Sequence, residues 1–190
     1  KRGIEGEALF YRAFFYFNVA RFWGDAPLRT EPANITNTSS PRAKYDKIYV
    51  QVIRDLEKAY ELMRTPQLVK EQTPGESRPH KYAACAYLSS VYLTLGSLLS
   101  HHADNFWDDT KSERKPDFSE LTVFEGMTFP LADDSQYQEA ARKAYQESLR
   151  YAEMLIPESG SHDSECPYRL CILRGDYYLS IRKSKQYHPA

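Results

Sequence analysis

The chain has 190 residues, and its 25 Lys and Arg against 26 Asp and Glu give a formal net charge of -1. That balance argues against a domain built to neutralise nucleic-acid phosphates, because such domains carry an excess of basic side chains. The longest apolar run is far shorter than the roughly 18 residues that a membrane span needs, so no transmembrane helix is expected. Residues 1–3 lead directly into a charged, helix-like stretch, so no signal peptide is expected either.

The first predicted helix covers residues 4–23 and is almost entirely apolar at its centre. Between Leu9 and Phe17 the only charged residue is Arg12. A helix that is apolar nearly all round packs inside an assembly of helices, so Trp23 at its end is expected in the core. An unpaired buried charge is costly, so Arg12 is expected to pair with a carboxylate on a neighbouring helix: Asp55 by preference, otherwise Glu57.

Three further helices are predicted, at 45–64, 79–95 and 136–156, from apolar residues at helical spacing. The connecting loops are expected at 33–43 and 69–76, and a long polar insertion at 101–135. We predict an all-α domain over residues 1–160, built of tetratricopeptide-like antiparallel helical hairpins, followed by an irregular tail at 161–190. The third and fourth helices are expected to face each other through small and aromatic residues, namely Ala83, Tyr87, Ala141 and Ala144.

No catalytic motif or cofactor site is found in the sequence. It contains no Gly-rich phosphate loop, no Gly-x-Ser-x-Gly elbow and no His-Glu-x-x-His helix, so the chain is not expected to be an enzyme. Calcium requires six or more oxygen ligands. Some of these can come from polar residues of the insertion, namely Asp104, Asn105, Asp108, Asp109, Asp133 and Asp134. A solvated acidic loop is the simpler interpretation, and no metal is predicted.

Phe106 and Trp107 are the candidate ligand-binding residues. They lie between Asn105 and Asp108 in the polar insertion. Sugar sites place flat aromatic faces against pyranose rings and frame them with polar side chains, and this stretch has that composition. The alternative, and the commoner role for a loop aromatic, is to pin the insertion onto the helices.

Ordered motifs over residues 4–156 resemble the SusD/RagB family. The first is Gly6-Glu7-Ala8, continued by Arg12-Ala13 and the turn Gly24-Asp25-Ala26-Pro27-Leu28. The stretch Ile53-Arg54-Asp55-Leu56 and the motif Val91-Tyr92-Leu93 resemble the second and third family helices. The tail at 161–190 does not resemble the family and is either native or the product of a frame shift.

The resemblance implies a non-catalytic, glycan-binding component of an outer-membrane polysaccharide-uptake system. Such proteins are lipid-anchored, face outward and act with a SusC-like TonB-dependent transporter. The chain is then expected to be a fragment that holds the tetratricopeptide-like helices, without the acylated Cys or the larger C-terminal part. The alternative is a helical-repeat protein-interaction module that binds no sugar.

Overall fold

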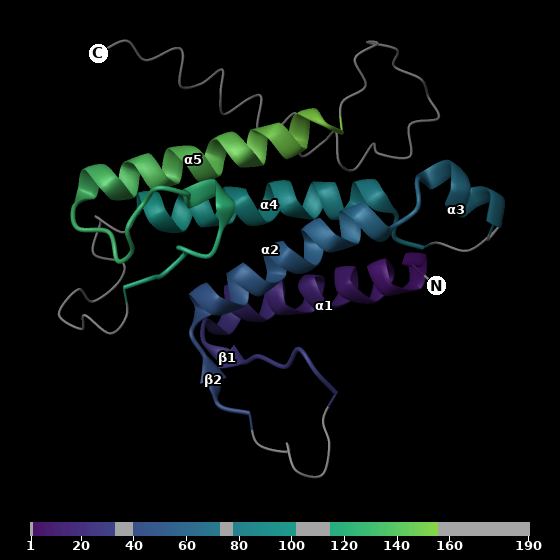
Figure 1. Ribbon diagram of the computed structural model, residues 1–190, viewed down its shortest axis with the longest axis horizontal. Coiled ribbons are helices and arrows are strands. Elements are labelled where there is room, and N and C mark those ends of the chain that lie inside the picture. The colour runs from purple at the N-terminus through teal and green to yellow at the C-terminus, as the bar shows by residue number, and fades with distance from the viewer. Residues whose placement is uncertain (1, 33–39, 73–77, 102–114, 156–190) are drawn as a thin grey trace.

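Within the part of the chain that the structure describes, four long helices lie side by side in chain order (Figure 1). The structure is a computed structural model that describes residues 2–32, 40–72, 78–101 and 115–155. Its elements are, in order, α1 (Arg2–Trp23), β1 (Ala26–Pro27), β2 (Arg42–Ala43), α2 (Tyr45–Leu62), α3 (Pro66–Gln72), α4 (Lys81–Ser100), the 3₁₀ helix η3 (Thr122–Phe124) and α5 (Asp134–Glu153). Helix α1 packs on α2, α2 on α4, and α4 on α5, each antiparallel to the one before. The predicted all-α class of antiparallel, tetratricopeptide-like hairpins is confirmed.

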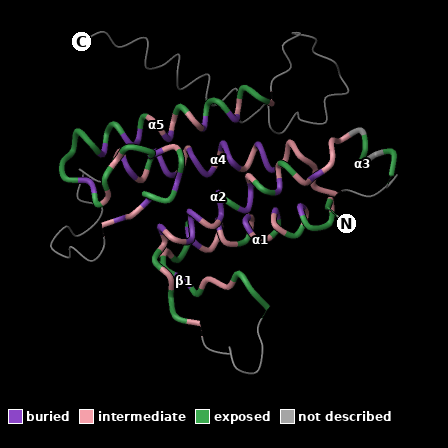
Figure 2. Tube along the Cα trace, in the orientation of Figure 1, coloured by how far each residue is buried: buried purple, intermediate pink, exposed green. Residues whose placement is uncertain are grey.

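Helix α4 lies at the centre of the stack, between α2 and α5 (Figure 2). By length and composition alone it is apolar enough to cross a membrane, although no such helix was expected from the sequence. Half of its most apolar window is buried inside the protein, including Leu88, Val91 and Leu95. A helix covered on two sides needs apolar residues on both, which explains its composition without a membrane.

The α4–α5 contact is close because small residues line it. The Ser89 hydroxyl donates to the Ser148 carbonyl at 2.9 Å, and the Ser148 hydroxyl donates to the Ser89 carbonyl at 2.7 Å. Ala141 and Ala144 are buried, as expected for this hairpin. Tyr87 was expected here as well, and that expectation is wrong. The Tyr87 ring packs edge-to-face on Phe10 and Phe14 of α1. Tyr87 lies two residues before Ser89, so its side chain points to the opposite face of α4 from the one that contacts α5.

Gly96 makes the tightest approach in this hairpin. A Cβ at this position would lie 2.7 Å from the ring of Tyr145 on α5. We expect Gly96→Val to lower the free energy of unfolding by about 1–3 kcal/mol, since the ring must shift to admit the side chain. Urea denaturation measures this, with Ser97→Val on the adjacent exposed position as the control for the helix propensity of valine. Equal losses in the two variants would show that the contact with Tyr145 is unimportant.

Helix α3 replaces part of the loop that was predicted at 69–76. Pro66 lies just beyond the helix predicted at 45–64, and it stands at the first position of a new helix. Proline is tolerated there because its missing N–H would have no partner within the helix. Val69 is buried, so this short helix packs against the rest of the protein through that side chain.

The second half of the predicted polar insertion contributes to the core. Phe118, Leu121, Phe124 and Leu131 are buried, and the Phe118 ring lies 6.1–6.2 Å from those of Phe124 and Phe129. The buried Asp46 carboxylate at the start of α2 accepts the backbone N–H of Asp117 at 2.8 Å. Residues 115–133 therefore cover the ends of the helices, which their aperiodic sequence did not reveal. The tail at 161–190 lies outside the described residues.

Candidate functional site

Arg12 of α1 forms the ion pair that was expected with Asp55 of α2. Its Nε lies 2.6 Å from Oδ2 and its Nη2 lies 2.7 Å from Oδ1, a bidentate geometry. The Asp55 side chain is 5% exposed and that of Arg12 is 28% exposed. The hydrogen bond to Asp55 raises the pKa of the Arg12 guanidinium, although burial opposes this. The second choice, Glu57, faces α5 instead, where burial and the nearby Glu147 raise its pKa.

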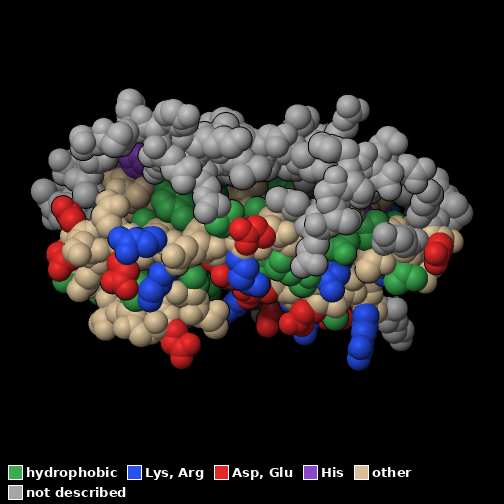
Figure 3. Space-filling model, turned by 90° about the horizontal axis from the view of Figure 1, so that it is seen from above, with side chains coloured by type: hydrophobic (Ala, Val, Ile, Leu, Met, Phe, Trp, Pro, Cys, Tyr) green, Lys and Arg blue, Asp and Glu red, His purple; other side chains and the backbone are tan. Residues whose placement is uncertain are grey.

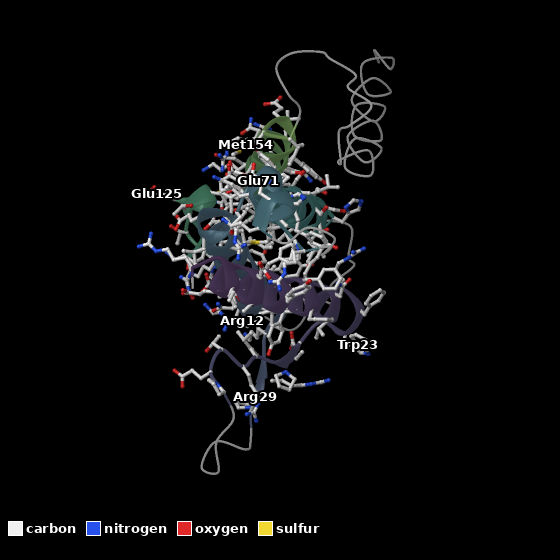
Figure 4. The ribbon with its side chains drawn as sticks, turned by 90° about the vertical axis from the view of Figure 1, so that its right-hand side faces the viewer. Arg12, Trp23, Arg29, Glu71, Glu125 and Met154 are labelled. Atoms are coloured by element: carbon white, nitrogen blue, oxygen red, sulfur yellow. The ribbon has the colours of Figure 1, made fainter. Side chains whose placement is uncertain are left out.

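The same guanidinium also fixes the segment that follows α1. Its Nη1 donates to the carbonyl of Thr30 at 2.9 Å. The Tyr16 hydroxyl accepts the backbone N–H of Arg29 at 2.8 Å and donates to the carbonyl of Pro27 at 3.3 Å. These hydrogen bonds hold residues 27–30 alongside α1. Figure 4 labels Arg12 on α1 and Arg29 in the segment that follows it.

A glycine makes the turn between α1 and β1 possible. Gly24 has a φ of +67°, in the left-handed region that other residues avoid. The next residue, Asp25, accepts the backbone N–H of Tyr45 at 2.9 Å and so joins the turn to the start of α2. Ala26 and Pro27 then pair with Ala43 and Arg42 in a short antiparallel ladder. The family-like turn motif at residues 24–28 therefore has a structural role: it forms the corner between α1 and the start of α2.

A pocket of about 240 Å³ lies beside this corner. Its lining comes from α1, α2 and α4 and consists of Ala20, Arg21, Gly24, Tyr45, Tyr49, Thr94 and Leu98. Burial raises the pKa of Tyr49 to about 12, while Arg21 opposes the shift, so this hydroxyl stays protonated at neutral pH. The volume falls below the range of about 300–1,000 Å³ that is typical of small-molecule sites. The pocket, whose surface is mostly apolar, is therefore too small to enclose a large ligand.

Two aromatic residues at the end of α1 are exposed. Phe22 is 72% exposed and Trp23 is 70% exposed, with ring centroids 5.7 Å apart. The expectation that Trp23 belongs to the core is wrong, and Figure 4 shows it at the outer edge of the molecule. The buried face of α1 is set by Phe10, Ala13 and Phe17, and the helical period turns Phe22 and Trp23 away from it. The same helical period, extended along the sequence to residue 23, would have identified Phe22 and Trp23 as exposed.

Phe106 and Trp107, the predicted ligand-binding pair, lie outside the described residues, and their role stays a prediction. The described residues on either side of that segment sit at one end of the stack. His101 follows α4, and Glu120 binds both Lys47 at 2.8 Å and Arg54 at 2.7 Å on α2.

Charges of both signs are interspersed on the face seen in Figure 3 rather than gathered into a basic field. In the described ranges, no group of three or more His, Cys, Asp or Glu side chains is placed to hold a metal ion. Asp133, one of the calcium candidates, caps α5 by accepting the backbone N–H of Gln136 at 2.9 Å. The candidates at 104–109 lie outside the described residues.

The N-terminal half of the chain is similar in sequence to known proteins. Residues 1–93 match the family SusD-like_3, described as starch-binding associating with outer membrane. The chain is 32% identical over 96 residues to SusD-like protein P2 of Formosa agariphila, which covers 49% of this chain and 18% of that protein. It is also similar to the crystal structure of a SusD-like protein from Bacteroides fragilis, with 28% identity, a TM-score of 0.44, and coverage of 50% of this chain and 18% of that one. The chain thus spans about a fifth of the length of these relatives.

Proposed function

We propose that this chain, whose residues 1–93 match the SusD-like family, forms the helical scaffold of a non-catalytic glycan-binding component of an outer-membrane polysaccharide-uptake system. The match over residues 1–93 carries the proposal. That stretch holds α1, α2 and the first part of α4, which together build most of the stack.

The geometry of the matched residues supports a scaffold role. Arg12 joins α1 to α2 through Asp55, and Gly24 turns the chain toward β1. These residues serve contacts and turns within the chain itself, so they position a binding surface without forming it. We assign the sugar contacts to aromatic residues of the loops, with Phe106 and Trp107 as first candidates.

The proposed partners are an oligosaccharide or polysaccharide and a SusC-like TonB-dependent transporter. The protein would work at the outer face of the outer membrane, with a lipid anchor outside this chain as its only membrane contact. Neither nucleic acid nor a cofactor has a role in the proposal.

Sequencing the DNA on both sides of the coding region tests the assignment. We expect a gene for a SusC-like transporter and genes for glycoside hydrolases nearby, with an upstream reading frame that encodes a lipoprotein signal ending in Cys. A locus with none of these would contradict the proposed uptake role.

One observation favours a protein-interaction module as the second candidate. The outer face of α1 exposes large apolar side chains, including Phe15 at 62%. Apolar surface of this kind on a helical stack is typical of protein contacts. Calorimetry of the whole protein with soluble glycans separates the candidates, because the glycan-binding component then gives binding heat and a pure interaction module gives none.

A further inference from the structure

The pocket beside Gly24 brings together two donors that have no acceptor in the described part of the chain. Arg21 and Tyr49 both line this pocket. Within the described ranges the Arg21 guanidinium forms no ion pair, and it lies over the Phe17 ring, 5.2 Å from the centroid. Tyr49 is only 2% exposed, yet its hydroxyl has no hydrogen-bond partner among the described residues. Buried polar groups in native proteins almost always have a partner, so water or a ligand must supply the acceptor.

The charges around the two tyrosines of the pocket differ. Burial raises the pKa of Tyr49 to about 12 and Arg21 opposes the shift, so the hydroxyl is a donor at neutral pH and lies within the field of the guanidinium. Burial also raises the pKa of Tyr45, and there the carboxylates of Asp46 and Asp25 add to the shift. An anion is therefore favoured at the Tyr49 side of the pocket and repelled at the Tyr45 side.

The rest of the pocket can accept an apolar group. Its surface is mostly apolar, with Ala20 and Leu98 in the lining, and the Tyr45 and Tyr49 rings stand edge-to-face with centroids 6.4 Å apart. The Thr94 hydroxyl donates to a backbone carbonyl within α4 at 2.9 Å, so it offers no donor to a ligand. An apolar cavity of about 150 Å³ is enough to hold benzene. The pocket of about 240 Å³ therefore admits one ring with a small polar group attached.

The two donors match a carboxylate better than other polar groups. A carboxylate has two acceptor oxygens and one charge, which one guanidinium and one hydroxyl can satisfy. A phosphate group carries more charge and more acceptors than Arg21 and Tyr49 can meet. A sugar ring would place several hydroxyl groups against the apolar lining, where each lost hydrogen bond is costly.

From these observations we propose that the pocket binds a small carboxylate whose apolar part is about the size of one ring. The carboxylate accepts from the Arg21 guanidinium and the Tyr49 hydroxyl, and the ring lies against Leu98 and the other apolar lining residues. The proposal does not depend on the proposed glycan binding, which involves other residues. A ligand of about nine non-hydrogen atoms gains only a small free energy of binding, so we expect a dissociation constant in the millimolar range.

Titration of the purified 190-residue chain with benzoate, followed by saturation-transfer NMR, tests the site. Benzamide has the same ring without the charge, and acetate has the charge without the ring. We expect benzoate to bind about 10-fold tighter than either, because a charge-assisted hydrogen bond and the buried ring both contribute. No saturable binding of benzoate, or equal binding of benzoate and benzamide or of benzoate and acetate, would overturn the proposal.

Three variants locate the binding. Arg21→Gln should weaken benzoate binding about 10-fold and leave benzamide unchanged, so the preference for the carboxylate is lost. Tyr49→Phe should weaken benzoate binding about 2- to 10-fold without lowering the stability of the chain, because its hydroxyl has no partner among the described residues. Arg142→Gln removes the same charge from an exposed position on α5 and is the matched control.

Circular dichroism and urea denaturation establish that the three variants are folded. Benzoate binding that either pocket variant leaves at the level of the unsubstituted chain would be adventitious binding only and would overturn the proposal. Loss of binding in Arg142→Gln would overturn it as well, since the charge that matters would then lie outside the pocket.

Discussion

Replacing Arg12 with methionine is expected to lower the free energy of unfolding by about 3–5 kcal/mol, because the buried carboxylate of Asp55 then loses its cationic partner. The Asp55 side chain is only 5% exposed, and of its described donors only the amide of Gln51, at 2.8 Å, would remain. The variant also removes the hydrogen bond to Thr30 that holds the segment after β1. Urea denaturation followed by circular dichroism measures the change.

Two control variants separate charge from geometry in this ion pair. Arg12→Lys keeps the charge but cannot form the bidentate contact, so we expect an intermediate loss. The double variant Arg12→Met/Asp55→Leu removes both charges and should recover much of the stability lost in Arg12→Met. If the double variant is as unstable as the sum of the two single variants, the contact between Arg12 and Asp55 is not the source of the effect.

Phe118→Ala should cost a similar amount, about 3–5 kcal/mol, since it removes a fully buried aromatic ring. Phe118 is 1% exposed and packs against Tyr45 as well as Phe124 and Phe129. The loss would show that residues 115–133 fold together with the helices. Thermal and urea unfolding measure it.

Leu149→Ala is the matched control for Phe118→Ala. Leu149 is 39% exposed on α5, so its truncation should change the unfolding free energy by no more than about 0.5 kcal/mol. If Phe118→Ala is equally mild, the segment at 115–133 does not contribute to the stability of the helical stack.

The helical stack could be predicted because its signals are local and periodic. Arg12 stands alone among apolar residues, so a carboxylate partner was required, and Asp55 lies on the buried side of the next helix. The order of the long helices followed from apolar spacing and from the loops between them. Proximity in sequence also favoured antiparallel neighbours.

Other features could not be derived from the same signals. Phe118 and Phe124 have no regular period, so nothing in the sequence distinguished a core segment from a polar loop. Pro66 is compatible with both the end and the beginning of a helix, and only the buried Val69 decides between them. Trp23 was assigned to the core because its helix is apolar nearly all round, although burial depends on which face of the helix a residue occupies.

The candidate sugar contacts depend on composition alone. Phe106 and Trp107 were selected because aromatic and polar residues occur together, and both lie outside the described residues. Their assignment rests on the proposed function, whereas the roles of Arg12, Asp55 and Gly24 rest on the structure.

Isothermal titration calorimetry of the purified chain against soluble starch and a panel of oligosaccharides tests most directly whether this chain is scaffold rather than binding site. A single aromatic pair contributes too little to offset the cost of association, so we expect weak binding or none, and no difference between the chain and Trp107→Ala. Tight, saturable binding that disappears in Trp107→Ala would contradict the account and make the insertion a sugar site in its own right.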